Sequence, residues 1–163
     1  MARGAVFFDV ENTSRAQHIE RVIHHLALPR RRDTDFIAVG NWRVVSVETA
    51  RLLARHGARL LHSAPAAGVK DWSDLSIAVA AGLWLGEARP GDSIAIVSDD
   101  RAFDAVGDVA ASLGVAFQRL SFRRLADLLD QDGRAPGQRA VITRSHSAAL
   151  SGSGTGSAPR SID

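Results

Sequence analysis

Residues 4–10 read Gly-Ala-Val-Phe-Phe-Asp-Val, and this segment decides the fold of the chain. A continuous apolar run that does not alternate with polar residues predicts a strand buried on both faces, as in the parallel sheets of α/β proteins. The run ends in an acid, because Asp9 follows Val-Phe-Phe directly. Packing alone does not explain a carboxylate at the end of a buried strand, so Asp9 is the first candidate for a functional residue.

The rest of the chain alternates between short apolar runs and amphipathic segments. Further strands are expected at residues 35–40, 59–62, 93–97 and 115–120, and helices at residues 15–28, 46–56, 73–87, 101–113 and 122–129. Strands that alternate with helices predict a parallel sheet with right-handed crossovers. We therefore predict a doubly wound α/β domain with a five-strand parallel sheet and helices on both faces.

The periodic pattern ends at Gly133, which divides the chain into two predicted parts. Residues 1–133 are long enough for one such domain. In residues 134–163, Ser, Gly, Ala and Pro fill more than half of the positions, and the charged residues are four arginines and one aspartate. Such a composition is typical of a flexible segment, so we expect a basic tail after the domain.

The composition restricts the classes of protein that fit. The 163 residues are 45% hydrophobic and 23% charged, which is typical of globular proteins. The absence of cysteine excludes disulfides, thiolate zinc sites and cysteine nucleophiles. No secretory leader is recognisable, and the longest apolar stretch, residues 76–85, is too short to span a bilayer. We expect a cytoplasmic protein that has no membrane partner.

The sequence pI of about 10.3 is weak evidence for nucleic-acid binding. The formal net charge is only +2, and Lys70 is the single lysine of a chain without tyrosine or cysteine. Few groups titrate between histidine and arginine, so a small excess of arginine raises the pI strongly. That excess lies in the predicted tail.

Acidic residues follow two strands that are expected to lie side by side. In open parallel sheets, ligands bind beyond the carboxyl ends of the strands, where the strand order reverses. The first and fourth strands are neighbours in this topology, and polar residues follow each of them or open the helices beside them. These residues are Asp9, Glu11, Asn12, Asp74, Asp99, Asp100 and Asp104. We expect several of their carboxylates to converge on one cleft.

Converging carboxylates repel one another, which raises their pKa values or recruits a cation. Oxygen ligands without cysteine or an obvious histidine partner suit Mg²⁺ or Mn²⁺, which polarise phosphoryl groups and activate water. Structural roles stay open for the individual residues. Asp74 fits a first-turn helix acid, Asp99 or Asp100 a helix cap, Asp104 a surface charge and Asn12 a turn residue.

Four segments, in this order, resemble motifs of the NYN branch of PIN-like nucleases. Phe-Phe-Asp-Val-Glu-Asn at 7–12 resembles the opening Asp-x-x-Asn motif, and Gly-Asn-Trp at 40–42 resembles the Tyr-Gly-x-Trp segment. Lys-Asp-Trp-Ser-Asp-Leu-Ser-Ile-Ala at 70–78 resembles the Lys-Gly-x-Asp-x-x-Leu-Ala stretch. Ile-Val-Ser-Asp-Asp-Arg-Ala-Phe at 96–103 resembles the Ser-x-Asp-x-Asp-Phe motif. The resemblance covers residues 4–130.

The resemblance implies a PIN-like fold and a Mg²⁺- or Mn²⁺-dependent endoribonuclease that hydrolyses RNA phosphodiester bonds. Asp9, Asp74 and Asp100 would hold the metal and position the attacking water, with Asp104 in a supporting role.

Two further roles and one departure accompany the resemblance. Asn12 would orient Asp9 or a phosphate oxygen, and Ser98 would support the acidic loop. The second Asp of Ser-x-Asp-x-Asp-Phe is replaced by Ala102, which leaves a one-metal enzyme open. The same replacement leaves open a catalytically degenerate RNA-binding domain on this fold. Asp104 is near enough in sequence to supply the missing carboxylate, although from a different direction.

A haloacid-dehalogenase-type phosphatase is the alternative enzyme. Phe-Asp-Val-Glu-Asn-Thr at 8–13 resembles its Asp-x-Asp-x-Thr motif, in which Asp9 would be the covalent nucleophile. Asp100 and Asp104 would form its second acidic motif, and Lys70 would bind phosphate. Against it, a glutamate replaces the second Asp, and no Ser or Thr ends the second strand. A response-regulator receiver fits less well, because its phosphorylated Asp and its Lys are missing after the third and fifth strands.

Basic and aromatic residues at the same edge are candidates for RNA contacts. Cationic side chains would meet phosphates, and tryptophan would stack on unpaired bases unless it packs half-buried. These candidates are Arg15, Trp42, Arg43, Lys70 and Arg101. Trp84 is expected in the core or at a subunit contact, which leaves a homodimer open. The histidines show no metal-ligand spacing, and His24 and His25 are expected on a helix surface.

Overall fold

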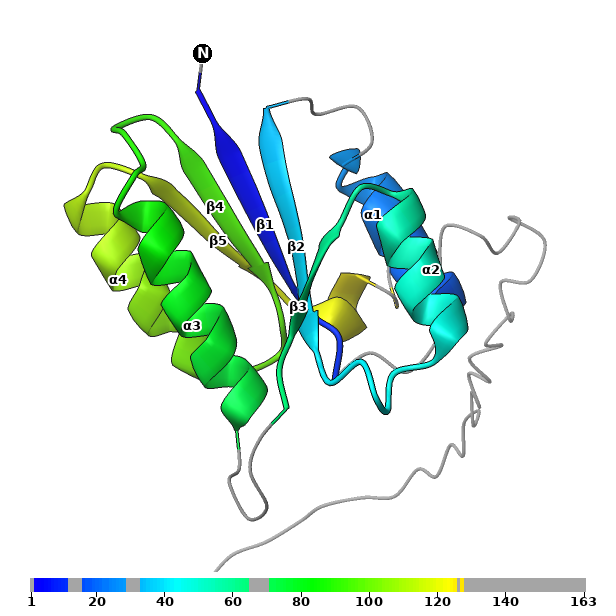
Figure 1. Cartoon of the computed structure of the whole chain (residues 1–163). Helices are drawn as coiled ribbons and strands as arrows, with labels where there is room; N and C mark the ends of the chain where they lie inside the picture. The colour runs from blue at the N-terminus through cyan, green and yellow to red at the C-terminus, as the bar shows by residue number, and fades with distance from the viewer. Residues whose placement is uncertain (1, 12–15, 29–32, 65–70, 126, 128–163) are drawn as a thin grey trace, which may run out of the picture. The chain divides into compact units, whose positions relative to one another are not determined.

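The computed structural model describes residues 2–11, 16–28, 33–64, 71–125 and 127, and the structural statements below concern this part of the chain. Five strands form one sheet, and every neighbouring pair in it is parallel (Figure 1). The strands are β1 (Gly4–Asp9), β2 (Thr34–Gly40), β3 (Arg59–His62), β4 (Ser93–Val97) and β5 (Ala116–Leu120). The predicted five-strand parallel sheet is confirmed.

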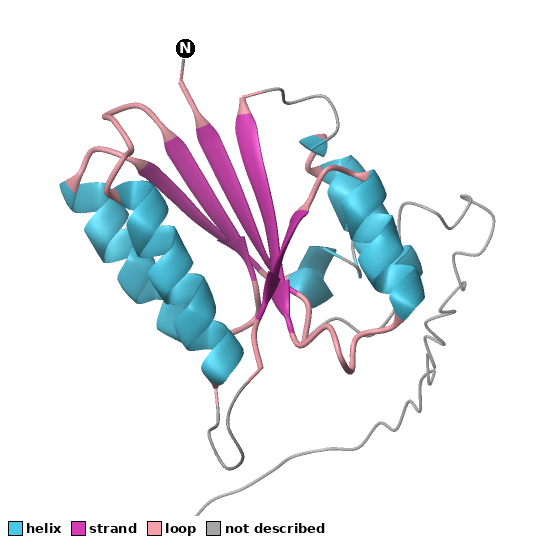
Figure 2. Ribbon diagram, in the orientation of Figure 1, coloured by secondary structure: helices cyan, strands magenta, loops and turns pink. Residues whose placement is uncertain are grey.

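Helices cover both faces of this sheet (Figure 2). Two helices and a helical segment after β5 pack on one face, and two helices pack on the other. The first group is α1 (Ala16–His25), α2 (Val47–Arg55) and residues 122–125. The second group is α3 (Trp72–Leu85) and α4 (Asp104–Ser112), with the 3₁₀ turn η2 (Arg101–Phe103) before α4.

Local sequence sets the ends of the helices. Ser46 caps α2 as predicted, because its Oγ accepts a hydrogen bond from the backbone N–H of Thr49 at 3.1 Å. Asp71 precedes α3 with a left-handed backbone (φ 55°), and its side chain makes no capping hydrogen bond. The helix predicted over 101–113 begins instead as η2, where Oδ1 of Asp100 accepts from the N–H of Ala102 at 2.8 Å.

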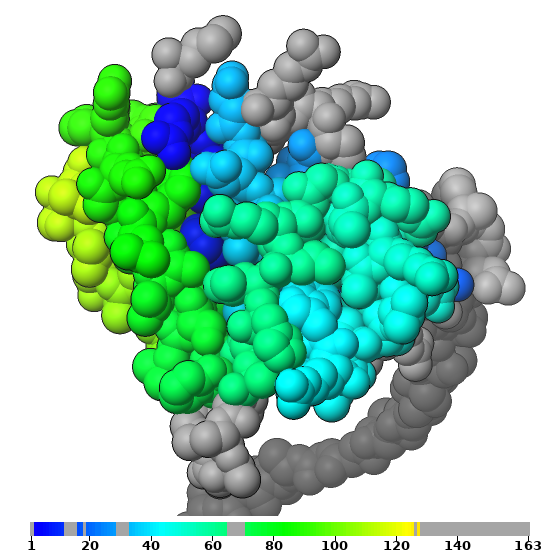
Figure 3. All heavy atoms as spheres, in the orientation of Figure 1, coloured from blue at the N-terminus to red at the C-terminus, as the bar shows by residue number. Residues whose placement is uncertain are grey.

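The side chains of β1 alternate between two cores, because successive strand residues point to opposite faces. Val6 and Phe8 belong to the core under α1 and α2, whereas Phe7 packs with Ile77 of α3 and Val106 of α4. Only small areas of β1 (blue) are visible between the cyan and green atoms in the space-filling view (Figure 3). The prediction of a first strand buried on both faces is confirmed.

The strand order is β3-β2-β1-β4-β5, so the direction in which strands are added reverses between β1 and β4. Phe8 pairs with Val97 in register, which brings the next residues, Asp9 and Ser98, to the same level of the carboxyl edge. Ligands of open α/β sheets bind at this point. No helix in the described residues is long and apolar enough to cross a membrane. The predicted tail, residues 134–163, lies outside them.

Candidate active site at the carboxyl edge of the sheet

The buried carboxylate of Asp9 forms the base of the candidate site. Asp9 ends β1 and is 1% exposed, and Ser98, which follows β4, is also 1% exposed. The Oγ of Ser98 donates a hydrogen bond to Oδ2 of Asp9 at 3.0 Å and accepts one from the N–H of Asp100 at 3.2 Å. Ser98 therefore connects the ends of the two central strands and fixes the loop that carries Asp100.

Asp74 reaches these residues from the first turn of α3. Burial, followed by the charges of Asp9 and Asp100, raises the pKa of Asp74 to about 6 from its ordinary 3.8. A hydrogen bond with Asp100 and the charge of Asp71 raise the pKa further. Three acids from three separate elements thus lie within electrostatic reach of one another.

A cavity of about 300 Å³ opens above this group. Its lining is dominated by carboxylates and consists of Glu11, Asp71, Ser73, Asp74, Asp99, Asp100 and Arg123. Of the three proposed ligands, Asp74 and Asp100 line this cavity, whereas the buried Asp9 does not.

Two of the additional acids already have partners in the protein. Asp99 accepts a short hydrogen bond from the hydroxyl of Ser121 and pairs with Arg123 at 3.2 Å. Glu11 accepts a hydrogen bond from the backbone N–H of Asn41 at 3.1 Å. These contacts hold the rim of the cavity in place.

The donor set of the cavity suits a hard divalent cation. Oδ1 of Asp74 is buried, and no described residue donates a hydrogen bond to it. A buried acceptor among like charges is costly unless a cation or a proton offsets it. Carboxylate oxygens are the ligands that Mg²⁺ and Mn²⁺ prefer. Asp74 and Asp100, which line the cavity, and Asp9, whose charge acts on Asp74, are of the kind that suits such an ion.

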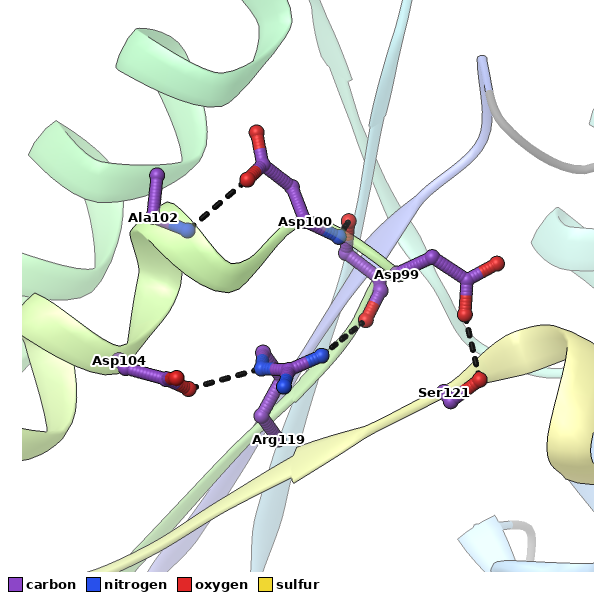
Figure 4. A network of polar contacts seen from close by, with 7 residues as sticks. Asp99, Asp100, Ala102, Asp104, Arg119 and Ser121 are labelled. Carbon is purple, nitrogen blue, oxygen red and sulfur yellow. Dashed lines mark hydrogen bonds and ion pairs between the residues drawn. The ribbon is translucent and has the colours of Figure 1, made fainter.

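Asp104, predicted in a supporting role, does not line this cavity. Its Oδ1 accepts a hydrogen bond from Nε of Arg119 at 2.8 Å, and Figure 4 shows it directed at Arg119 rather than at the carboxylate of Asp100. Ala102 contributes only its backbone N–H, to Asp100. The carboxylate that Ala102 lacks is thus not replaced by Asp104.

The residues predicted to contact substrate lie in different surroundings. Arg43 is exposed on the loop after β2, and Arg101 is exposed in η2. Trp42 is half-buried against the α1–α2 core, and its indole N–H donates to the carbonyl of Leu61 at 2.9 Å. Trp84 lies in the core, 8% exposed. The predicted contacts Asn12, Arg15 and Lys70 fall outside the described residues.

A second cavity, of about 600 Å³, lies beside the acidic one and contains residues that the sequence did not single out. It is lined by Asp99, Arg101, Arg119, Leu120, Ser121, Arg124 and Leu125. Asp99 lines both cavities, so they are neighbours. Arg119 and Arg124 could have been found from the position of the fifth predicted strand, which ends at the same edge.

The prediction that His24 and His25 lie on a helix surface is confirmed, because both are exposed on α1. His24 also belongs to a group that the sequence did not single out. Carboxylate and imidazole atoms of Glu20, His24 and His56 lie within 4.8 Å of one another. Glu20 and His24 are one turn apart on α1, and His56 comes from the end of α2. No regular sequence spacing therefore indicates the group. The rings of His24 and His56 meet edge to face, with centroids 5.4 Å apart. This potential metal-binding group does not line the acidic cavity.

An all-parallel α/β sheet with acids gathered at its carboxyl edge agrees with the predicted PIN-like class. The family model of the NYN domain matches residues 3–141, and the chain therefore belongs to the NYN domain family. Domains of this family are generally nuclease-like and act on RNA. The match continues past Gly133, the predicted end of the domain. Comparison with curated proteins gives no match.

Proposed function

We propose that this chain is a divalent-metal-dependent endoribonuclease, which hydrolyses phosphodiester bonds of RNA with Asp9, Asp74 and Asp100 as ligands of Mg²⁺ or Mn²⁺. The observation that carries the proposal is the cluster of these three carboxylates at the β1–β4 edge, where burial, followed by the charges of Asp9 and Asp100, raises the pKa of Asp74 to about 6. Repulsion of this kind is offset when a divalent cation binds.

Each acid has a separate task in this proposal. Asp9 is buried and held by Ser98, so it gives the site a fixed ligand oxygen. Asp100 is held by the N–H of Ala102 and belongs to the same loop as Ser98. Asp74 closes the site from α3. The metal, when bound, polarises the scissile phosphate and lowers the pKa of the attacking water.

RNA approaches this site over a surface that also carries cations. We propose that Arg43 and Arg101, which are exposed at this edge, contact phosphates, together with Arg15 and Lys70. Asn12 would orient Asp9 or a phosphate oxygen. Such contacts read the backbone and carry no base specificity. We expect the enzyme to act in the cytoplasm.

A catalytically degenerate RNA-binding domain is the second candidate. One observation favours it: the position of Ala102 lacks a carboxylate, and Asp104 pairs with Arg119 instead of entering the acidic cavity. Such a domain would bind RNA without needing a divalent ion. Two observations count against the phosphatase alternative. The chain belongs to the NYN family, and β2 ends in Gly40, which has no hydroxyl to bind phosphate.

A circular single-stranded RNA tests the proposal, since only an endonuclease opens a circle. We expect linear products with Mn²⁺ or Mg²⁺, none with EDTA, and none with Asp100→Asn. Intact circles under all conditions, together with RNA binding in EDTA, would establish the degenerate binder instead.

A further inference from the structure

The second cavity has the opposite charge to the proposed catalytic cavity beside it. Arg101, Arg119 and Arg124 line it, with Asp99 as its one lining acid. Asp104 and Arg123 pair with residues of this lining, so the whole group holds four arginines and two aspartates. A concave surface with excess arginine attracts anions.

Arg119 is the most firmly placed of these arginines. Its Nε donates to Oδ1 of Asp104 at 2.8 Å (Figure 4). Its Nη1 donates to the carbonyl of Ser98 at 3.5 Å. The side chain of Arg119 is only 22% exposed. Two contacts on the guanidinium orient its plane, and no described residue is hydrogen-bonded to the third nitrogen, Nη2. Less ordering entropy is therefore lost when an anion binds.

The Ser98 contact also connects the two cavities. The carbonyl of Ser98 accepts from Arg119, while its hydroxyl donates to Asp9. Arg119 is therefore fixed relative to the proposed metal ligands. A polyanion that reaches the carboxylates experiences repulsion until its charge is offset, and a guanidinium next to the site offsets part of it.

We propose that the arginine cavity binds a phosphate of the RNA strand next to the scissile phosphate, with Arg119 as the principal contact and Asp104 as its positioning residue. This inference rests on the proposed function, because it takes the RNA of that reaction as the ligand. Arginine suits the task, since its planar donors match phosphate oxygens in pairs. Contacts to phosphate make this binding independent of base sequence.

The test is the binding of a fluorescein-labelled single-stranded oligoribonucleotide to the full chain in EDTA, measured by anisotropy over a series of salt concentrations. We expect Arg119→Gln to weaken binding about tenfold at low salt and to lower the slope of log affinity against log salt by about one. Arg55→Gln, an exposed arginine of α2, is the matched control and should leave both values unchanged.

Asp104→Asn separates positioning from simple charge. Removal of this carboxylate makes the surface more positive, so non-specific attraction alone would tighten RNA binding. The neutral amide of asparagine would hold Arg119 less firmly than the carboxylate does, which would instead weaken binding about threefold to tenfold, and Asp104→Glu should restore it. Circular dichroism of each variant checks the fold. Tighter binding by Asp104→Asn would overturn the positioning role.

The outcomes distinguish this inference from the proposed nuclease. If Arg119→Gln binds RNA as well as the original chain, or if the original chain does not bind RNA, the phosphate site is wrong. RNA binding that depends on Arg119 in a protein that cleaves nothing would support the phosphate site and reject the nuclease. Metal-dependent cleavage with an unchanged KM in Arg119→Gln would reject the phosphate site and support the nuclease.

Discussion

Ser98 donates a hydrogen bond from its hydroxyl to Oδ2 of Asp9 at 3.0 Å, and both residues are 1% exposed. This contact joins the ends of β1 and β4, two strands that are far apart in sequence and adjacent in the sheet. A buried carboxylate depends on such donors, because it has lost its contacts with water. The proposed catalytic edge is thus also part of the folded core.

The first prediction concerns this hydrogen bond. Ser98→Ala removes the donor and leaves Oδ2 of Asp9 buried, so we expect a loss of about 1.5–3 kcal/mol in the free energy of unfolding. RNA cleavage should fall about tenfold as the loop of Asp100 loosens. Urea unfolding and initial cleavage rates measure these effects. Ser112→Ala, which removes an exposed helix-end contact, is the control and should change little.

The second prediction follows from the pKa of Asp74. In the folded chain Asp74 keeps its proton up to about pH 6, whereas its ordinary pKa is 3.8. Between these values the folded state binds more protons, so the contribution of Asp74 to stability falls as pH rises and stays unfavourable above pH 6.

Asp74→Asn removes this penalty. In EDTA we expect the variant to be more stable than the original chain by about 1 kcal/mol near neutral pH, less than the full shift would give because solvent screens a partly exposed group. At about pH 4 the gain should disappear. Urea midpoints at both pH values measure it, with Asp108→Asn on the exposed face of α4 as control. An equal gain at both pH values would contradict the stated cause.

The third prediction tests the packing of α4 on β5. A Cβ added at Gly107 would lie 2.5 Å from Cδ1 of Phe117, too close without movement of the ring. Overpacking typically costs about 1–3 kcal/mol, against a helix-propensity gain of about 1 kcal/mol. We expect Gly107→Ala to destabilise the domain. Gly82→Ala in α3, where a Cβ meets nothing within 4 Å, should stabilise it. The melting temperatures of both variants, measured by thermal unfolding, test this prediction.

The fourth prediction concerns metal binding. Mn²⁺ that binds only the folded state should stabilise it by about 2.7 kcal/mol at one hundred times the dissociation constant. EDTA should reverse this stabilisation, and Asp100→Asn should abolish it. His56→Ala should retain it, because His56 belongs to the separate group with Glu20 and His24. If His56→Ala, but not Asp100→Asn, abolished the stabilisation by Mn²⁺, the metal would be assigned to that group instead.

The strand positions and the burial of β1 were predictable because they follow from local apolar patterns, whereas β3 is exposed along its whole length. The third and fourth predicted strands, 59–62 and 93–97, agree with β3 and β4 residue for residue. Burial of β1 on both faces could be inferred from its continuous apolar run. The position of Asp9 next to the loop after β4 could be inferred from the usual strand order of such sheets.

Side-chain directions at the site were not predictable from the sequence. The segment after Asp100 forms a 3₁₀ turn, which has fewer residues per turn than the α-helix expected there, so the direction of Asp104 differs from that of a continuous helix. The pairing of Asp104 with Arg119 also needs the position of β5. The group of Glu20, His24 and His56 was not predictable for a similar reason, because its residues come from two separate helices.

The measurement that tests the central claim most directly is Mn²⁺-dependent cleavage of single-stranded RNA by the full chain and by Asp9→Asn, Asp74→Asn and Asp108→Asn. We predict cleavage by the original chain and by Asp108→Asn, and a loss of at least about a hundredfold in the other two variants. Folded Asp9→Asn and Asp74→Asn variants that cleave RNA at the original rate would contradict the assignment of these carboxylates to a catalytic metal.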